Sequence, residues 1–167
     1  MSLETFSSRN VNVAWGGMNI VGLAQDGFVT ITPSSDITDE EVGSDGQLQT
    51  SILPDRTGTV TIQLQQNSPS NNDLAGLLDD QMYGSRFFRK AEMTVCDPSG
   101  SVIVRMINAY LKSRPEITLG STATGNTYSW TFFCEELRYL AQPNFISAEL
   151  SVDIGSRVDS AKGIVGR

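Results

Sequence analysis

The sequence predicts a mainly β protein, an antiparallel β-sandwich or barrel with one flanking α-helix. Residues 59–65 alternate strictly between polar and apolar side chains, which is typical of a half-buried strand. Apolar residues recur at helical spacing after Ser70, and short segments rich in β-branched and aromatic residues are evenly spaced along the rest of the chain. With 167 residues, 39% of them hydrophobic and 19% charged, the chain fits a single globular domain with a real core.

The strands can be justified in order along the chain. Asp26-Gly27 predicts a tight hairpin turn between the second and third strands, and Asp97-Pro98-Ser99-Gly100 fits a type I turn later on. Besides the alternating strand, the predicted strands are Val11–Trp15, Met18–Leu23, Phe28–Thr32, Ala91–Cys96, Ser101–Leu111, Glu116–Leu119, Tyr128–Cys134 and Phe145–Ile154.

The alternating strand is the best defined of these elements. Val60, Ile62 and Leu64 fall on one side and predict a core face. The opposite side is polar throughout, and it carries Thr59, Thr61, Gln63 and Gln65.

The helix is predicted over about residues 70–82. Leu74, Leu77, Leu78 and Met82 recur at helical spacing, so we expect the helix to lie on a sheet through its leucines. Ser70 is predicted as the N-cap, and Asp73 then suits the N-terminal end of the helix dipole.

The segment from residue 34 to 57 has little periodicity and is predicted as a long loop. Its acidic residues are followed by no basic residue until Arg56, and they are Asp36, Asp39, Glu40, Glu41 and Asp45. A solvated acidic loop is the plain interpretation for an arbitrary protein. A calcium site is the alternative interpretation, but the carboxylates lack the ligand spacing of an EF-hand loop.

Nothing in the sequence predicts an enzyme, a metal or a cofactor. The chain has no histidine, which removes His-based general bases and the commonest transition-metal ligand. Cys96 and Cys134 lie in apolar stretches and are predicted as buried free thiols. The carboxylate pairs Asp79-Asp80 and Glu135-Glu136 are adjacent in sequence, so their side chains should point apart rather than act as an acid and a base.

Two motifs in this order resemble the central signature of tail tube proteins from contractile-tailed phages. The first is the acidic glycine turn Glu41–Gln47, and the second runs from Thr57 through the alternating strand to Leu74, with Gln65–Leu74 the most specific portion. Ser44 is a small departure where that family often has alanine. The resemblance covers nearly the whole chain as a single domain of residues 1–167, with an N-terminal arm (1–10) and a C-terminal tail (155–167).

The resemblance implies a structural virion protein that forms hexameric rings, which stack into the inner tail tube and deliver DNA. Residues 34–57 would reach the next ring, and opposite charge would guide the docking. The complementary basic candidates are Arg86, Arg89, Lys90, Arg105, Lys112 and Arg114. The lumen candidates are Thr30, Thr32, Thr61, Gln63 and Gln65, although these side chains could equally form an ordinary solvent face.

The net charge of −7 has the wrong sign for a DNA-binding protein and suits a passive acidic or polar conduit. The partners implied are further copies of the chain, a tail sheath protein, a baseplate initiator and a tail terminator, with no membrane. DNA would pass without specific binding, and the protein would belong to the virion after assembly in the host cytoplasm. One alternative is the tube subunit of a contractile bacteriocin or injection machine. A carbohydrate-binding sandwich is another, but Trp15 and Trp130 lie in apolar contexts that predict core positions.

Overall fold

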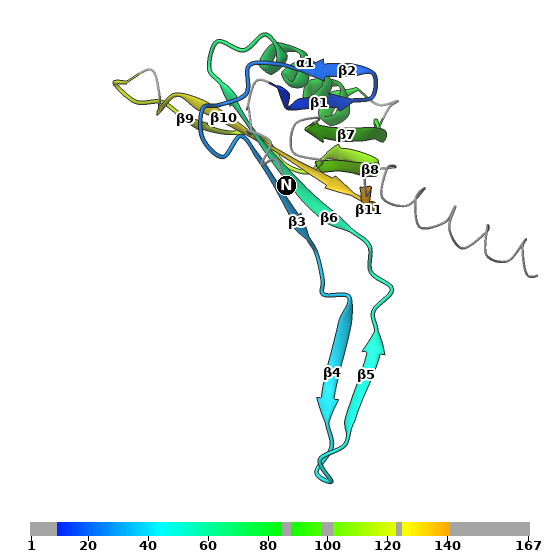
Figure 1. Cartoon of the computed structure of the whole chain (residues 1–167). Coiled ribbons are helices and arrows are strands. Elements are labelled where there is room, and N and C mark those ends of the chain that lie inside the picture. Colours follow the sequence, from blue (N-terminus) through cyan, green and yellow to red (C-terminus); the bar gives the residue numbers. More distant parts are fainter. Residues whose placement is uncertain (1–9, 85–87, 98–101, 123–124, 141–167) are drawn as a thin grey trace, which may run out of the picture.

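The computed structural model describes residues 10–84, 88–97, 102–122 and 125–140. Most of the elements are antiparallel strands, and a single helix lies among the described residues (Figure 1). In chain order the elements are β1 (Asn12–Trp15), β2 (Met18–Ile20), β3 (Val29–Pro33), β4 (Thr38–Val42), β5 (Leu48–Ile52), β6 (Gly58–Gln65), α1 (Ser70–Tyr83), β7 (Ala91–Asp97), β8 (Val102–Leu111), β9 (Glu116–Thr118), β10 (Thr127–Cys134) and β11 (Glu136–Leu140). The predicted strand Phe145–Ile154, the turn residues 98–100, Ser101 and the C-terminal tail lie outside the described residues.

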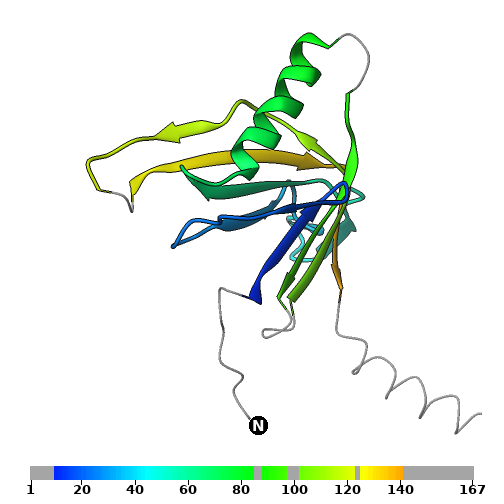
Figure 2. The same ribbon diagram turned by 90° about the horizontal axis from the view of Figure 1, so that it is seen from above.

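The main sheet has nine strands in two halves that share β8. Its order is β2-β1-β7-β8-β10-β6-β3, with β11 also paired to β8 and β9 to β10. The first part of β8 pairs with β7 and β11, whereas Tyr110 and Leu111 pair with β10. Close to this change of partner, Asn108 has a φ of 54°, a conformation that asparagine tolerates better than most residues. The two halves meet at an angle, as the view from above shows (Figure 2).

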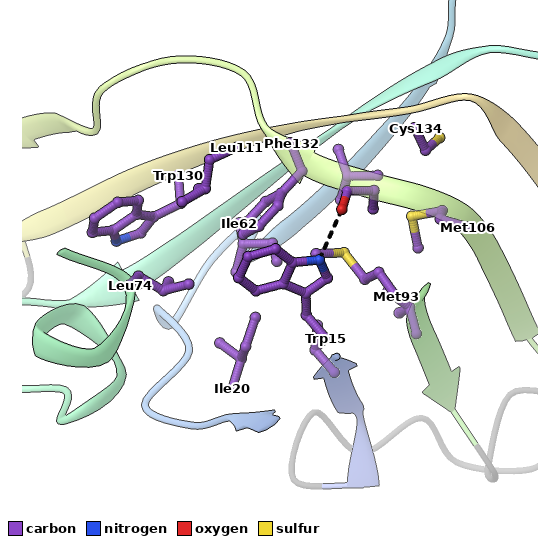
Figure 3. Packing of buried hydrophobic residues seen from close by; sticks show 14 of the residues in the cluster. Trp15, Ile20, Ile62, Leu74, Met93, Met106, Leu111, Trp130, Phe132 and Cys134 are labelled. Atoms are coloured by element: carbon purple, nitrogen blue, oxygen red, sulfur yellow. Dashed lines mark hydrogen bonds between the residues drawn. The ribbon is translucent and has the colours of Figure 1, made fainter. Parts of the chain in front are cut away.

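The core lies between these halves. Strands make up most of the described elements, so the mainly β prediction is confirmed. Trp15 of β1 meets Phe132 of β10 edge to face, with ring centroids 5.1 Å apart. The indole Nε1 of Trp15 also donates a hydrogen bond of 3.0 Å to the Ala109 carbonyl (Figure 3). Val60, Ile62 and Leu64 of β6 are fully buried, which confirms the predicted core face of the alternating strand.

The helix is confirmed, but its predicted N-cap is wrong. Pro69 occupies the cap position, and Ser70 is the first helical residue. The Ser70 hydroxyl accepts a 3.0 Å hydrogen bond from the Val21 N–H, while the Ser68 hydroxyl donates to the Val21 carbonyl at 2.6 Å. The serine hydroxyl therefore fixes a distant segment to the helix instead of capping its own backbone. Leu74 is buried, whereas Met82 at the far end is 43% exposed.

The predicted hairpin at Asp26-Gly27 is also wrong. Leu23 bridges to Leu64 and Val29 pairs with Ile62, both antiparallel to β6. The chain therefore keeps one direction along β6, and residues 24–28 form an outward bend in an interrupted edge strand. A local turn signal could not reveal this because the pairing partner lies about forty residues downstream.

The segment predicted as a long loop is instead a β-hairpin. Strands β4 and β5 form a separate two-stranded sheet that projects from the body at the ends of β3 and β6 (Figure 1). Both strands are short and polar, so neither shows a clear alternation in the sequence. β11, which the sequence did not predict, pairs along β8. No helix of the described residues has the length and apolar character needed to cross a membrane.

Candidate assembly surfaces

The projecting hairpin has two chemically different faces. Cross-strand pairing puts Val42 opposite Leu48 and Thr38 opposite Ile52, so these residues share one face with Glu40 and Thr50. The other face carries Asp39 opposite Ser51 and Glu41 opposite Gln49. One face is therefore partly apolar, while the other is acidic and polar.

The apolar side chains of the hairpin are unusually exposed. Val42, Leu48 and Ile52 are 65%, 64% and 81% exposed. An isolated two-stranded hairpin is only marginally stable in water, and exposed apolar groups that cluster together commonly mark an interaction surface. The hairpin is thus suited to contact another surface.

The tip of the hairpin, Gly43–Gln47, is held by its own hydrogen bonds. The Gly43 N–H donates to the Gln47 carbonyl at 2.9 Å, and the Gly46 N–H donates to the Gly43 carbonyl at 2.9 Å. The Asp45 carboxylate accepts from the Gln47 N–H at 3.2 Å. Gly46 has a φ of 79°, which glycine adopts without the strain that a side chain would add.

A second surface is the polar face formed by β3, β6, β10 and β9. Cross-strand pairing aligns Thr30, Thr61 and Thr131 in one row. A further row holds Gln63, Ser129 and Glu116, and the next holds Gln65, Thr127 and Thr118. The five lumen candidates thus lie on one face. The row nearest the hairpin holds Thr32, Thr59 and Phe133, and Lys112 lies over the Phe133 ring.

The basic candidates are dispersed, and several already have acidic partners. Arg105 Nε lies 2.5 Å from Glu92 Oε1, and Lys90 Nζ lies 2.5 Å from Glu135 Oε1. Arg89 donates to the Gly16 carbonyl at 3.0 Å and lies over the Trp15 ring. Lys112 lies over the Phe133 ring, Arg114 is exposed, and Arg86 lies outside the described residues. The sequence could not reveal the neutralisation of Lys90, because its partner lies 45 residues away.

The acidic candidates are all exposed and lie along the hairpin. Asp36 precedes β4, Asp39, Glu40 and Glu41 lie within it, and Asp45 lies at the tip. Arg56 lies at the base, where it pairs with Glu136 at 3.5 Å. The structure therefore gathers the acidic candidates on one projecting element.

A known protein family matches most of this chain. Residues 7–140 match the family model described as Bacteriophage PhiTE tail tube protein. The chain belongs to this tail tube family. It is a structural tube protein, as the resemblance in its sequence had predicted. No curated protein sequence matches the chain significantly.

Solved structures share the fold of this tail tube protein at low sequence identity. The tube-terminating cap of the anti-feeding prophage has a TM-score of 0.58 and 11% identity, over 83% of this chain and 92% of that chain. A chain of the PVC sheath-tube complex, an extracellular contractile injection system in its extended state, has a TM-score of 0.56 and 12% identity, over 83% and 93%. A chain of a native gene transfer agent particle has a TM-score of 0.53 and 14% identity, over 82% and 100%.

The carboxylate pair Glu135-Glu136 has a structural role in the tube protein. Glu135 lies between β10 and β11 and accepts from Lys90 and from Asn108 Nδ2 at 2.7 Å, at the bend of β8. These hydrogen bonds lower the pKa of Glu135, the one from Lys90 most strongly. Glu136 pairs with Arg138 at 2.7 Å and with Arg56. The two carboxylates thus fix the corner where the sheet changes halves.

Sequence reasoning missed several residues of both surfaces. On the polar face these are Glu116, Thr118, Thr127, Ser129 and Thr131, and on the hairpin they are Val42, Leu48 and Ile52. The alternation of polar and apolar residues along residues 127–132 is a usable signal for Thr127, Ser129 and Thr131. The hairpin residues gave no such signal, because their exposure depends on the hairpin projecting from the body. Cys134 is a buried free thiol as predicted, whereas Cys96 is free and only partly buried.

Proposed function

We propose that six copies of this tube protein form a ring and that the rings stack into a hollow tail tube for DNA delivery. The observation that carries the proposal is the polar face of β3, β6, β9 and β10, which holds rows of threonine, serine and glutamine side chains, in a member of a tail tube family. That face would line the lumen, and the role is structural rather than enzymatic.

The chemistry of this face suits a passive conduit. Double-stranded DNA carries about one negative charge per 1.7 Å, so lysines and arginines on the wall would hold it by counterion release. Hydroxyl and amide groups offer no such attachment, so Lys112, which lies over Phe133 at the hairpin end of the face, would be an isolated point of attraction. The net charge of −7 disfavours binding further. Thr30, Thr32, Thr61, Gln63 and Gln65 would therefore contact passing DNA without holding it.

The hairpin would join one ring to the next. Its exposed apolar side chains and its acidic side chains would both find partners on an adjacent copy, which would stabilise an element that is marginal alone. Arg89, Lys112 and Arg114 remain the basic candidates without an acidic partner among the described residues. Lys90 and Arg105 would have to exchange their present partners.

The tube would be one part of a larger tail that contains further proteins. A chain of similar fold belongs to a PVC sheath/tube terminator in the extended state, with a TM-score of 0.56. We expect this tube to carry a sheath outside it, an initiator at the baseplate and a terminator at the other end. The assembled protein would belong to the phage tail, and assembly would take place in the host cytoplasm.

A second candidate function is the tube of a related contractile injection device. The fold likeness to the anti-feeding prophage cap and to the PVC complex favours this alternative. Ring formation and stacking would be the same, and only the cargo would differ. Sheath and DNA-packaging genes beside the coding sequence would favour the phage tail, whereas toxin genes without packaging genes would favour the injection device.

The proposal is tested by electron microscopy of concentrated protein, with light scattering on the same sample. Hollow tubes, or six-fold rings with an opening wide enough for a DNA duplex, are the expected result. A chain that stays monomeric even with a tail initiator complex would contradict the proposal.

A further inference from the structure

A recess lined by side-chain amides lies at one end of the polar face. It has a volume of about 400 Å³, and its lining residues are Ala24, Gln25, Gln65, Gln66, Asn67, Asn126 and Thr127. Gln65 ends β6 and Thr127 begins β10, and these two residues pair directly. The hairpin leaves the sheet at the opposite end, where Pro33 of β3 pairs with Gly58 of β6. The recess and the hairpin are therefore at opposite ends of the same strands.

The walls of the recess are held in place by Asn126. Its Oδ1 accepts from the Gly120 N–H at 2.6 Å, and its Nδ2 donates to Gln66 Oε1 at 3.1 Å. The Gln66 N–H also donates to the Asn126 carbonyl at 3.2 Å. This bonding leaves the Nε2 hydrogens of Gln66 available to a ligand.

Other amides of the recess have unused hydrogen-bonding capacity. Gln25, Gln65 and Asn67 are exposed, and their side chains have no hydrogen-bond partner among the described residues. A wall of this kind offers several N–H donors, and donors of this kind bind carboxylates strongly.

The hairpin tip offers a matching set of acceptors. Asp45 uses one carboxylate oxygen on the Gln47 N–H and keeps the other free, while Glu41 has no partner among the described residues. The hydrogen bonds within Gly43–Gln47 fix the shape of the tip before any contact. A preformed tip loses little conformational entropy on docking.

The reach of the hairpin permits contact with another copy. Gly43 lies ten residues after Pro33, which is about 30 Å of extended chain, whereas the eight residues of β6 span about 25 Å. A projection at one end and a recess at the other give a head-to-tail contact, and such contacts repeat along a line. The cluster of Lys90, Tyr110 and Phe133 lies at the same end of the sheet as the hairpin, because Phe133 pairs with Thr59. This cluster is therefore at the opposite end from the recess.

We propose that the amide-lined recess receives the hairpin tip, Gly43–Gln47, of a second copy in the adjacent ring. This inference rests on the proposed function and names the partner of its stacking contact. The Glu41 and Asp45 carboxylates accept hydrogen bonds from the amides of the recess, and this contact fixes the orientation of each ring relative to the next.

Disulfide cross-linking between copies tests the inference. One preparation carries Asp45→Cys and another carries Gln25→Cys, both with Cys96→Ser, and the two are assembled together and oxidised. Cross-linked dimers between the two variants are expected only in assembled tubes. The control replaces Gln25→Cys by Asp79→Cys on the exposed side of α1, and it should give no more than a tenth of that product.

A charge variant gives an independent readout. Gln66→Glu keeps an acceptor for Asn126 but puts a carboxylate opposite the tip, so the critical concentration for tube assembly should rise at least tenfold. Asn72→Asp adds the same charge on α1 and should leave it unchanged. Asp45→Asn should restore part of the assembly of Gln66→Glu.

The outcomes separate this inference from the proposed function. Tubes that form without the cross-link, and that tolerate Gln66→Glu, overturn the recess as the docking site but leave the tube intact. A wild-type chain that forms neither rings nor tubes overturns both.

Discussion

Asn71 connects the helix to both inner strands of the polar half of the sheet. Its Nδ2 donates to the Gln65 carbonyl at 2.8 Å, and its Oδ1 accepts from Trp130 Nε1 at 3.0 Å. Asn71 is 7% exposed and Trp130 is 1% exposed, so water cannot readily replace either bond. One buried amide therefore satisfies an indole donor and a strand carbonyl together.

The Asn71→Ala variant should lose about 2–4 kcal/mol of unfolding free energy, because it leaves a buried donor and a buried acceptor without partners. Urea unfolding of the unassembled protein measures this. The control is Asn72→Ala, since Asn72 is exposed on the same helix and its side chain makes no hydrogen bond among the described residues. Because alanine favours the helix more than asparagine does at either position, a loss at Asn71 no larger than that at Asn72 would contradict the role of the buried bonds.

Gly22 is required by both its conformation and its neighbour. Its φ is 75°, and an added Cβ would lie 2.6 Å from Ser68 Cβ. Gly27 has a φ of 58° but open space around it, so Gly27→Ala carries the backbone strain alone. In thermal unfolding Gly22→Ala should be less stable than Gly27→Ala by about 1–3 kcal/mol, the usual cost of overpacking. A smaller loss at Gly22 than at Gly27 would contradict this account of the Val21–Ser68 contact.

The ion pair of Lys90 and Glu135 should make stability depend on acid pH. The lysine, and then Asn108, hold the pKa of Glu135 below its ordinary value of 4.5. Because the folded pKa is the lower one, the stabilisation is complete above pH 4.5 and is lost as the pH falls below it. Glu135→Gln and Lys90→Met should both lose less stability than the wild type between pH 5 and pH 3. Wild-type acid dependence in both variants would exclude the pair as a source of stability.

At the level of elements, the body and the hairpin should be separable. Replacing residues 36–54 by an Asn-Gly turn keeps the pairing of Ser34 with Thr57 and closes β3 onto β6. We expect a melting temperature within a few degrees of the wild type, because the hairpin strands contact chiefly each other, together with a loss of tube assembly. Normal tubes from this variant would contradict the role of the hairpin in stacking.

The sequence predicted the elements whose burial shows in their own periodicity. Strand β6, strand β10 and helix α1 bury every second residue or one helical stripe, so their patterns were sufficient. The hairpin β4–β5 escaped prediction because both its faces are exposed in the single chain, and no buried face imposes alternation. The Ser70 and Asp26-Gly27 predictions failed because contacts distant in sequence, to Val21 and along β6, outweighed local signals.

The candidate surfaces were predictable to different extents for the same reason. The lumen candidates lie on one face because alternation determines the side of a strand on which a residue lies. The basic candidates were counted from a sequence segment, and such a count cannot detect that Glu135 neutralises Lys90 from another strand.

For the whole molecule, one side of the sheet forms the core, and we propose that the opposite side lines the tube. The sheet buries Trp15, Phe132 and the apolar side of β6 in the core. Its opposite face carries mainly hydroxyl and amide groups, with Phe133 at the hairpin end. Projection of the hairpin at one end and the recess at the other give the chain a direction. These features together predict a polar tube in which every subunit points the same way.

The most direct test of this account is a helical reconstruction by electron cryomicroscopy of tubes assembled from the full chain. We predict six subunits per ring, with Thr61, Gln63 and Ser129 facing a lumen wide enough for a DNA duplex and α1 outside it. A tube in which α1 or the hairpin lines the lumen, or a filament without a lumen, would contradict it.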